Sequence, residues 1–255
     1  MKKIRVGIVN YLNTRPLLYG LENSPVRGQI DFIPDYPSNI ARDLREGKID
    51  MGLVPVAIIP EMQEWHLVSD FCIGCDGPVA SVCLFSEVPI DKIENVLLDY
   101  QSHTSLELTR ILLRDHWKVH PKLVRTSRDC RDEIRGTTAG LVIGDRSFEQ
   151  RRKSAFAYDL GQAWKELTGL PFVFAAWVSN KELDRSFVKL FNDANAYGII
   201  NIERVAADNA YPLFDMHSYY TRYISYRLDE KKQQGLNRFL ELMKEPVSNE
   251  TPSVS

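Results

Sequence analysis

Short apolar runs alternate with a helical pattern near the start of the chain. Residues 4–9 (IRVGIV), 30–33 (IDFI) and 49–56 (IDMGLVPV) each have the length and composition of a buried strand. Between the second and third runs, residues 40–46 carry apolar side chains at helical spacing, with Ser38 as the expected cap of the helix, and Gly47 ends the pattern. Strands that alternate with helices in this way predict a mostly parallel sheet with right-handed crossovers.

A second unit of the same kind begins near residue 93. Its first expected strand, at 96–99, leads to a helix at 106–114 that residues 102–105 (SHTS) cap. Two longer apolar runs, 77–86 (GPVASVCLFS) and 170–178 (LPFVFAAWV), flank this unit and are long enough to pass from one folding unit into another. The remaining expected elements are strands at 123–124 and 141–145 and helices at 181–198, 199–209 and 230–243.

These patterns favour an α/β protein with two lobes joined by two crossing hinge strands. We assign residues 1–84 and 177–255 to the first lobe and residues 85–176 to the second. Residues 245–255 are rich in Ser, Pro, Asn and Thr and are expected to form a disordered tail. A cleft between two hinged lobes can close on a small ligand. One continuous doubly wound sheet is the alternative arrangement.

Composition narrows the classes of function. The chain has 255 residues, of which 44% are hydrophobic and 26% charged, as in an ordinary globular protein. Its formal net charge of -2 argues against a nucleic-acid binder, which needs a clustered basic excess. The sequence shows neither a signal-peptide pattern nor an apolar run of about 18 residues, the length of a membrane span. We therefore expect a cytoplasmic protein, either a monomer or a homodimer, that does not bind membranes.

The cysteines and glycines give no reason to expect a metal or a cofactor. Cys72 and Cys75 have CxxC spacing, but no second well-spaced pair of ligands accompanies them, so we interpret them, together with Cys83 and Cys130, as thiols without a metal role. The sequence has no Gly-rich phosphate loop, which argues against a nucleotide.

The end of the first strand is the clearest candidate binding edge. The polar residues Asn10, Asn13 and Arg15 follow the strand directly, and Pro16 suits the first turn of the next helix. In open α/β sheets, ligands bind beyond the carboxyl ends of strands, where helix N-termini also point. An ordinary strand–helix turn with solvated polar groups is the alternative interpretation.

Five segments together resemble the chorismate dehydratase family of the futalosine route to menaquinone. They are VGIVNYLNTRPLLYGL, GPVASVCLFS, LDYQSHTSLELTRILL, GLVIGD and DLGQAWKELTGLPFVFAAWV, in this order between residues 6 and 178. The phrase LREGKIDMGLVPV is also typical of the first lobe of type 2 periplasmic-binding-protein folds. The resemblance implies that fold, used by an enzyme that removes water from chorismate to give 3-[(1-carboxyvinyl)oxy]benzoate.

The resemblance also implies two catalytic residues. It puts a functional serine in the run 77–86, where Ser81 matches, and a functional asparagine in the first loop. Asn13 is the better match for that asparagine, although Asn10 is close enough to reach the same ligand. From the residues alone, a serine within a strand is most simply structural.

Chorismate is a dianion, so its enzyme needs groups that bind carboxylates. Thr104 and Ser105 lie at an expected helix N-terminus, as do Ser38 and Asn39 in the first lobe, although capping alone would also explain them. Arg15 is the candidate for a bidentate carboxylate pair, or it forms a salt bridge elsewhere. Asp145, at the end of its strand, could contact ligand, but orienting a donor or capping the next segment suits a carboxylate better.

No residue is evident as a dedicated base. His103 is the one histidine beside a candidate binding element, and we interpret it as a surface residue. We therefore expect the enolpyruvyl carboxylate of the substrate to take the C3 proton itself. Three other functions fit the fold: a non-catalytic receptor for small solutes, the sister enzyme 1,4-dihydroxy-6-naphthoate synthase, and the ligand-binding part of a transcription regulator. The opening NYLNTRP favours the dehydratase.

Overall fold

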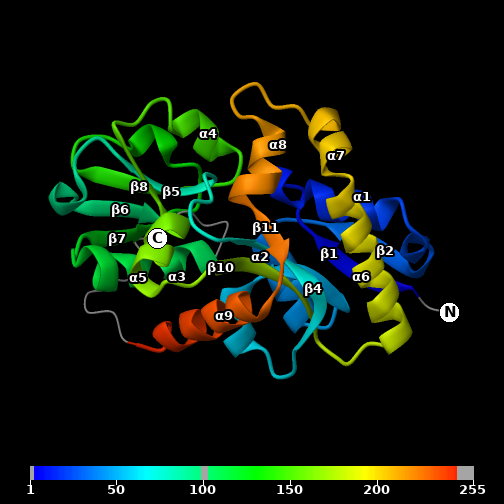
Figure 1. Ribbon diagram of the computed structural model, residues 1–255. Helices are drawn as coiled ribbons and strands as arrows, with labels where there is room; N and C mark the ends of the chain where they lie inside the picture. The colour runs from blue at the N-terminus through cyan, green and yellow to red at the C-terminus, as the bar shows by residue number, and fades with distance from the viewer. Residues whose placement is uncertain (1–2, 99–102, 246–255) are drawn as a thin grey trace.

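The computed structural model describes residues 3–98 and 103–245, in which two mixed β-sheets organise the chain (Figure 1). The first sheet has the strand order β11-β4-β10-β3-β1-β2 and the second has the order β7-β6-β8-β5-β9. The first sheet contains Ile4–Ile8 (β1), Ile30–Pro34 (β2), Met51–Pro55 (β3), His66–Cys75 (β4), Phe172–Ser179 (β10) and Ser225–Arg227 (β11). The second contains Val82–Ser86 (β5), Asn95–Leu98 (β6), Lys122–Arg125 (β7), Thr138–Ile143 (β8) and Phe156–Asp159 (β9).

Strand direction follows from the route of the chain. β1 runs parallel to β2 and β3, and β6 runs parallel to β7 and β8, as the strand–helix alternation predicts. The chain passes between the lobes twice, just before β5 (the first crossing) and just before β10 (the second crossing). These two strands are antiparallel to both of their neighbours. The expected α/β class and two-lobed arrangement are confirmed, and each sheet forms the centre of one lobe.

The strand pairings indicate where the chain passes from one sheet to the other. β5 pairs with β8 and β9 from Val82 to Ser86, so the chain has entered the second lobe before residue 84. β10 pairs with β4 from Phe172 onward, so the return is complete before residue 177. In the sequence, the apolar run 77–86 looks like one continuous strand. In the structure, Gly77 and Ala80 interrupt it with φ angles of +112° and +63°.

Helices pack around both sheets (Figure 1). They are Arg15–Glu22 (α1), Pro37–Arg45 (α2), His103–Ile111 (α3), Arg146–Gln150 (α4), Leu160–Thr168 (α5), Arg185–Ile200 (α6), Ile202–Asp208 (α7), Met216–Ser218 (α8) and Glu230–Leu242 (α9). The expected helices in the last third correspond to α6, α7 and α9. None of the helices in the described part of the chain is long and apolar enough to cross a membrane.

A close helix contact fixes α1, the helix that follows the candidate binding loop. α1 crosses α6 at Gly20 and Gly198, where a Cβ atom on Gly198 would lie 1.9 Å from the Pro16 carbonyl oxygen. Only glycine permits this approach of the two backbones. The start of α1 is thereby anchored to the first lobe.

The C-terminal segment forms a further connection between the lobes. Figure 1 shows α8 between α4 of the second lobe and α7 of the first, before the chain joins the first sheet as β11. Phe148 of α4 stacks on Phe214 with ring centres 4.5 Å apart and meets Tyr219 edge-on at 5.3 Å. Phe148 belongs to the second lobe, whereas the other two rings belong to the C-terminal segment that continues into the first sheet. These ring contacts therefore hold the two lobes together.

The cysteines are structural thiols. Cys72 and Cys75 lie on β4 and Cys83 on β5, all three completely buried and without a disulfide. Burial raises the pKa of the Cys72 thiol to about 12 and raises the pKa values of the other two well above their usual range. A protonated thiol is a poor nucleophile, and complete burial makes these three side chains part of the core.

Candidate active site between the lobes

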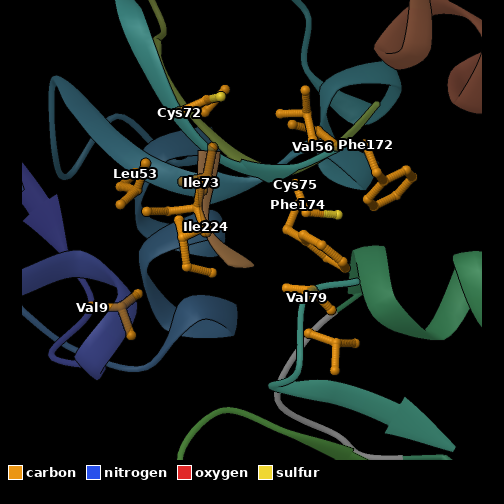
Figure 2. Close-up of a cluster of buried hydrophobic side chains, with 14 of the residues drawn as sticks. Val9, Leu53, Val56, Cys72, Ile73, Cys75, Val79, Phe172, Phe174 and Ile224 are labelled. Carbon is orange, nitrogen blue, oxygen red and sulfur yellow. The ribbon is translucent and has the colours of Figure 1, made fainter. Parts of the chain in front are cut away.

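A pocket lies between the two lobes, with an enclosed volume of about 60 Å³ and a volume of about 570 Å³ when the open space at its mouth is included. Its walls are mainly apolar, and Figure 2 shows five of the apolar side chains, which come from the β1 end, β3, β4, β10 and the first crossing. The pocket is lined by Val9, Tyr11, Asn13, Thr14, Pro37, Leu53, Pro55, Ile73, Val79, Val82, Ser105, Ile143, Phe174 and Ala175. Such a space suits a flat ring that carries a small number of polar groups.

Asn13 lies in this pocket with an unused amide oxygen. It belongs to a short 3₁₀ turn, Leu12–Thr14, between β1 and α1. The Thr14 hydroxyl lies 2.7 Å from the carbonyl oxygens of Val9 and Tyr11, and the Tyr226 hydroxyl donates to the Asn13 carbonyl oxygen at 3.0 Å. The side-chain oxygen of Asn13 is buried and has no hydrogen-bond partner. A buried polar atom without a partner is costly, so the site is prepared for a ligand that supplies one.

The other asparagine of the loop is placed differently. Asn10 is exposed and does not line the pocket. The structure therefore separates two residues that the sequence left as alternatives for one role.

Ser81 is not among the described residues that line the pocket, although two of its neighbours in the sequence are. It is completely buried, and it stands between Val79 and Val82, which both line the pocket. The Tyr219 hydroxyl donates to the Ser81 Oγ at 2.7 Å. The Ser81 hydroxyl donates to the Val79 carbonyl oxygen, with 3.4 Å between the two oxygens. This distance is longer than the usual O–H···O range of about 2.5–3.0 Å.

Arg15 and Asp145 interact electrostatically across the lobe boundary, although neither is among the described residues that line the pocket. The Leu12 N–H donates to the Asp145 carboxylate, while the Arg15 Nε and one Asp145 oxygen are buried without a hydrogen-bond partner. Burial raises the pKa of Asp145, against the effects of the Leu12 hydrogen bond and the Arg15 charge. The Tyr220 hydroxyl is a third buried atom without a partner, and it interacts electrostatically with both groups. This cluster has unused capacity for a further polar group.

The residues at the start of α3 divide into two roles. Ser105 lines the pocket, as a candidate binding residue should. Thr104 is completely buried, and its Oγ1 accepts a hydrogen bond of 3.1 Å from the Ala57 N–H of the first lobe, so it joins the lobes. His103 has a side chain that is 53% exposed and lies 4.0 Å from Glu61, as expected of a surface residue. Residues 99–102, which include part of the expected cap, lie outside the described residues.

The expectation that Ser38 caps its helix is wrong. α2 begins at Pro37, and Tyr36 occupies the N-cap position without a side-chain hydrogen bond. Proline is favoured at the first position of a helix, so Pro37 moves the start of α2 forward by two residues. Ser38 is exposed, and the Asn39 amide donates to the Asp35 carboxylate at 2.8 Å. Pro37 is the residue of this turn that lines the pocket.

Sequence reasoning missed the tyrosines of the C-terminal segment. Tyr219, Tyr220 and Tyr226 contact or approach the site, although the last third of the chain offered no recognisable motif. The signal that could have found them is the aromatic run 211–226 (YPLFDMHSYYTRYISY), which is too rich in tyrosine for an ordinary surface loop.

Known proteins match nearly the whole length of this chain in sequence. The model of a family described as menaquinone biosynthesis matches residues 4–245. A protein named chorismate dehydratase from Thermus thermophilus is 27% identical, over 97% of this chain and 98% of that protein. A second protein of that name, from Campylobacter jejuni, is 24% identical, over 93% of this chain and 96% of that protein.

Solved structures share the fold at low sequence identity. A crystal structure of an Archaeoglobus fulgidus protein has a TM-score of 0.75 at 14% identity, and covers 94% of this chain and 96% of that one. A Candida albicans protein described as having the generic periplasmic-binding-protein fold has a TM-score of 0.60 at 14% identity, and covers 98% and 92%. The expected fold is thus confirmed, and, by the match over residues 4–245, the chain belongs to the menaquinone-biosynthesis family.

Proposed function

We propose that this protein is a chorismate dehydratase, which converts chorismate to 3-[(1-carboxyvinyl)oxy]benzoate and water. Two relatives that match nearly the whole chain carry that name. The observation that carries the proposal is the apolar pocket between the lobes, with the partnerless Asn13 oxygen inside it. The ring of chorismate would lie against the apolar walls, and its C4 hydroxyl would donate a hydrogen bond to that oxygen.

The reaction depends more on stabilising negative charge in the transition state than on a strong acid or base of the protein. The proton at C3 and the hydroxyl at C4 leave as water, and the C3–H electron pair enters the ring, which becomes aromatic. Because the C3 position is conjugated through a double bond with the ring carboxylate, charge that develops at C3 spreads onto the carboxylate oxygens. Hydrogen-bond donors aimed at these oxygens would lower the barrier.

The described residues supply groups for both carboxylates and for the ring. The apolar walls, with Leu53, Ile73 and Phe174 among them, would hold the ring. Ser105 near the start of α3 offers a hydroxyl in the pocket, and the Arg15 guanidinium beside the pocket could pair with a carboxylate. Asp145 would keep Arg15 and the Leu12 loop in place.

The substrate would provide its own base. Among the described residues that line the pocket there is no carboxylate, imidazole or amine. The enolpyruvyl group is bonded to C3 through its ether oxygen, and a pocket that fixes its conformation would bring its carboxylate to the C3 proton. The carboxylic acid formed in this way would pass its proton to the departing C4 hydroxyl, so that one water molecule leaves and the carboxylate is restored.

The direct test is incubation of the purified protein with chorismate, followed by mass spectrometry and ultraviolet absorbance. We expect an aromatic product that is lighter than chorismate by one water. Unchanged chorismate, or the release of pyruvate, would contradict the proposal. We also propose a cytoplasmic location, which the biosynthetic names of the family and the relatives support.

A further inference from the structure

The backbone at Ser81 has an unusual and strained shape. The Ser81 N–H donates to the Val79 carbonyl oxygen at 2.7 Å, which closes a three-residue turn around Ala80. Ala80 has a φ of +63°, in the left-handed region that favours glycine. Strain of this kind persists only where the surroundings enforce it, and it collects at functional sites.

Neighbouring groups enforce this turn from both sides. The Asp159 carboxylate accepts hydrogen bonds from the Val79 N–H at 3.0 Å and from the Ala80 N–H at 2.7 Å. The Ser81 carbonyl oxygen accepts from the Ser147 hydroxyl at 3.0 Å. With its backbone fixed in this way, Ser81 retains only the rotation of its side chain and of its hydroxyl proton.

Tyr219 fixes that remaining freedom. Its hydroxyl donates to the Ser81 Oγ at 2.7 Å, and its ring is completely buried. Phe148 and Phe214 meet the ring edge-on, with centres 5.3 Å and 6.0 Å away, so the ring cannot turn from Ser81. Burial raises the pKa of Tyr219 far above its usual range, so its hydroxyl stays a donor at every pH used in assays.

The consequence concerns the direction of the Ser81 proton. A hydroxyl has one proton and two acceptor lone pairs, and the Tyr219 hydroxyl occupies one lone pair. The proton must therefore point elsewhere, and its contact with the Val79 carbonyl oxygen at 3.4 Å is weak. The hydrogen bond that Ser81 accepts also polarises its own O–H group and strengthens it as a donor.

We propose that Tyr219 is a positioning residue for the dehydration, which acts by keeping the Ser81 hydroxyl a donor toward negative charge on the substrate. The proposal rests on the proposed function. It gives a role to a residue of the C-terminal segment, where the sequence offers no motif.

The test is a double-mutant cycle of Tyr219→Phe and Ser81→Ala, assayed with chorismate beside the unmodified protein. We expect Tyr219→Phe to lower kcat about tenfold with little change in KM, because it loses one hydrogen bond that matters in the transition state. In the Ser81→Ala background, the same substitution should have no further effect. Tyr223→Phe is the matched control, because Tyr223 lies in the same turn and contacts Phe214 but does not contact Ser81.

Each outcome decides between specific alternatives. Equal losses from Tyr219→Phe in both backgrounds would show a merely structural role and overturn the proposal. Full activity of Tyr219→Phe or of Ser81→Ala would also overturn it. If the unmodified protein leaves chorismate unchanged, the proposed function fails and this proposal fails with it, whereas an active unmodified protein with an unaffected Tyr219→Phe variant removes only the role of Tyr219.

Discussion

At the scale of single residues, the site depends on buried polar atoms that lack partners. The Asn13 oxygen, the Arg15 Nε, one Asp145 oxygen and the Tyr220 hydroxyl are all of this kind. An ordinary core satisfies such atoms, and leaving one without a partner costs about 1–3 kcal/mol. Their concentration at the lobe boundary is typical of a site that completes its hydrogen bonds with a ligand.

Asn13 and Asn10 form a natural matched pair for mutation. We expect Asn13→Ala to lower kcat/KM for chorismate by about 10²–10³, the usual effect of removing a group that contacts developing charge. Asn10→Ala should stay near the unmodified rate, because Asn10 is exposed and outside the pocket. Steady-state kinetics together with melting temperatures measure both effects, and equal losses in the two variants would refute the assignment of Asn13.

His103 tests the role of the substrate as base. Its side chain is half exposed beside Glu61, so His103→Ala should retain nearly the full rate. A protein base typically contributes about 10²–10⁴ to a rate. A loss of about a thousandfold in the variant, with its melting temperature unchanged, would mean that the protein and not the substrate takes the C3 proton.

At the scale of elements, Asp159 links the turn before β5 to α5, the helix that precedes β10. Its carboxylate accepts from the N–H groups of Gly161 and Gln162, as the N-cap of α5, and from those of Val79 and Ala80. One side chain thus satisfies the start of a helix and the strained turn before Ser81.

Asp159→Ala should therefore destabilise the protein by about 2–3 kcal/mol, since several N–H groups lose a charged acceptor. Asp159→Asn keeps one acceptor oxygen and should lose less. Urea unfolding measures the free energies. An Asp159→Ala variant as stable as the unmodified protein would contradict the view that this carboxylate maintains the crossing.

The same elements show where sequence patterns succeed and where they stop. Apolar periodicity located most strands and helices, because burial of one face imposes it directly. It gave no sign of the turn before Ser81, since residues 77–86 stay apolar while Ala80 turns the backbone. It also missed the cap of α2, where Pro37 displaced Ser38, and the tyrosines 219, 220 and 226, whose roles arise only when distant segments meet.

At the scale of the whole molecule, one ion network ties neighbouring strands of the first sheet. Asp50, just before β3, accepts hydrogen bonds from the Arg5 side chain at 3.0 Å and from Lys181 at 2.6 Å. Burial alone would raise the pKa of Asp50, but the hydrogen bonds from Arg5 and Lys181 outweigh it and hold the pKa well below its usual range. The folded protein thus binds this proton less tightly than the unfolded chain does.

The contribution of Asp50 to stability should depend on pH. It is complete above the unfolded pKa of about 3.9 and is lost as the pH falls through the lower folded value. We expect Asp50→Asn to cost about 1–2 kcal/mol at neutral pH, because both cations are partly exposed, and to flatten the acid side of the stability profile. Asp31→Asn, at an exposed pair with Lys3, is the control. Parallel acid profiles for Asp50→Asn and the unmodified protein would refute this role.

A crystal structure with 3-[(1-carboxyvinyl)oxy]benzoate bound tests the central claim most directly. The account predicts the aromatic ring between the apolar walls of the two lobes. It also predicts that the Asn13 amide of one lobe and the Ser81 hydroxyl both donate hydrogen bonds to oxygen atoms of the product. A product bound outside this pocket, or a product in the pocket that touches neither Asn13 nor Ser81, would contradict it.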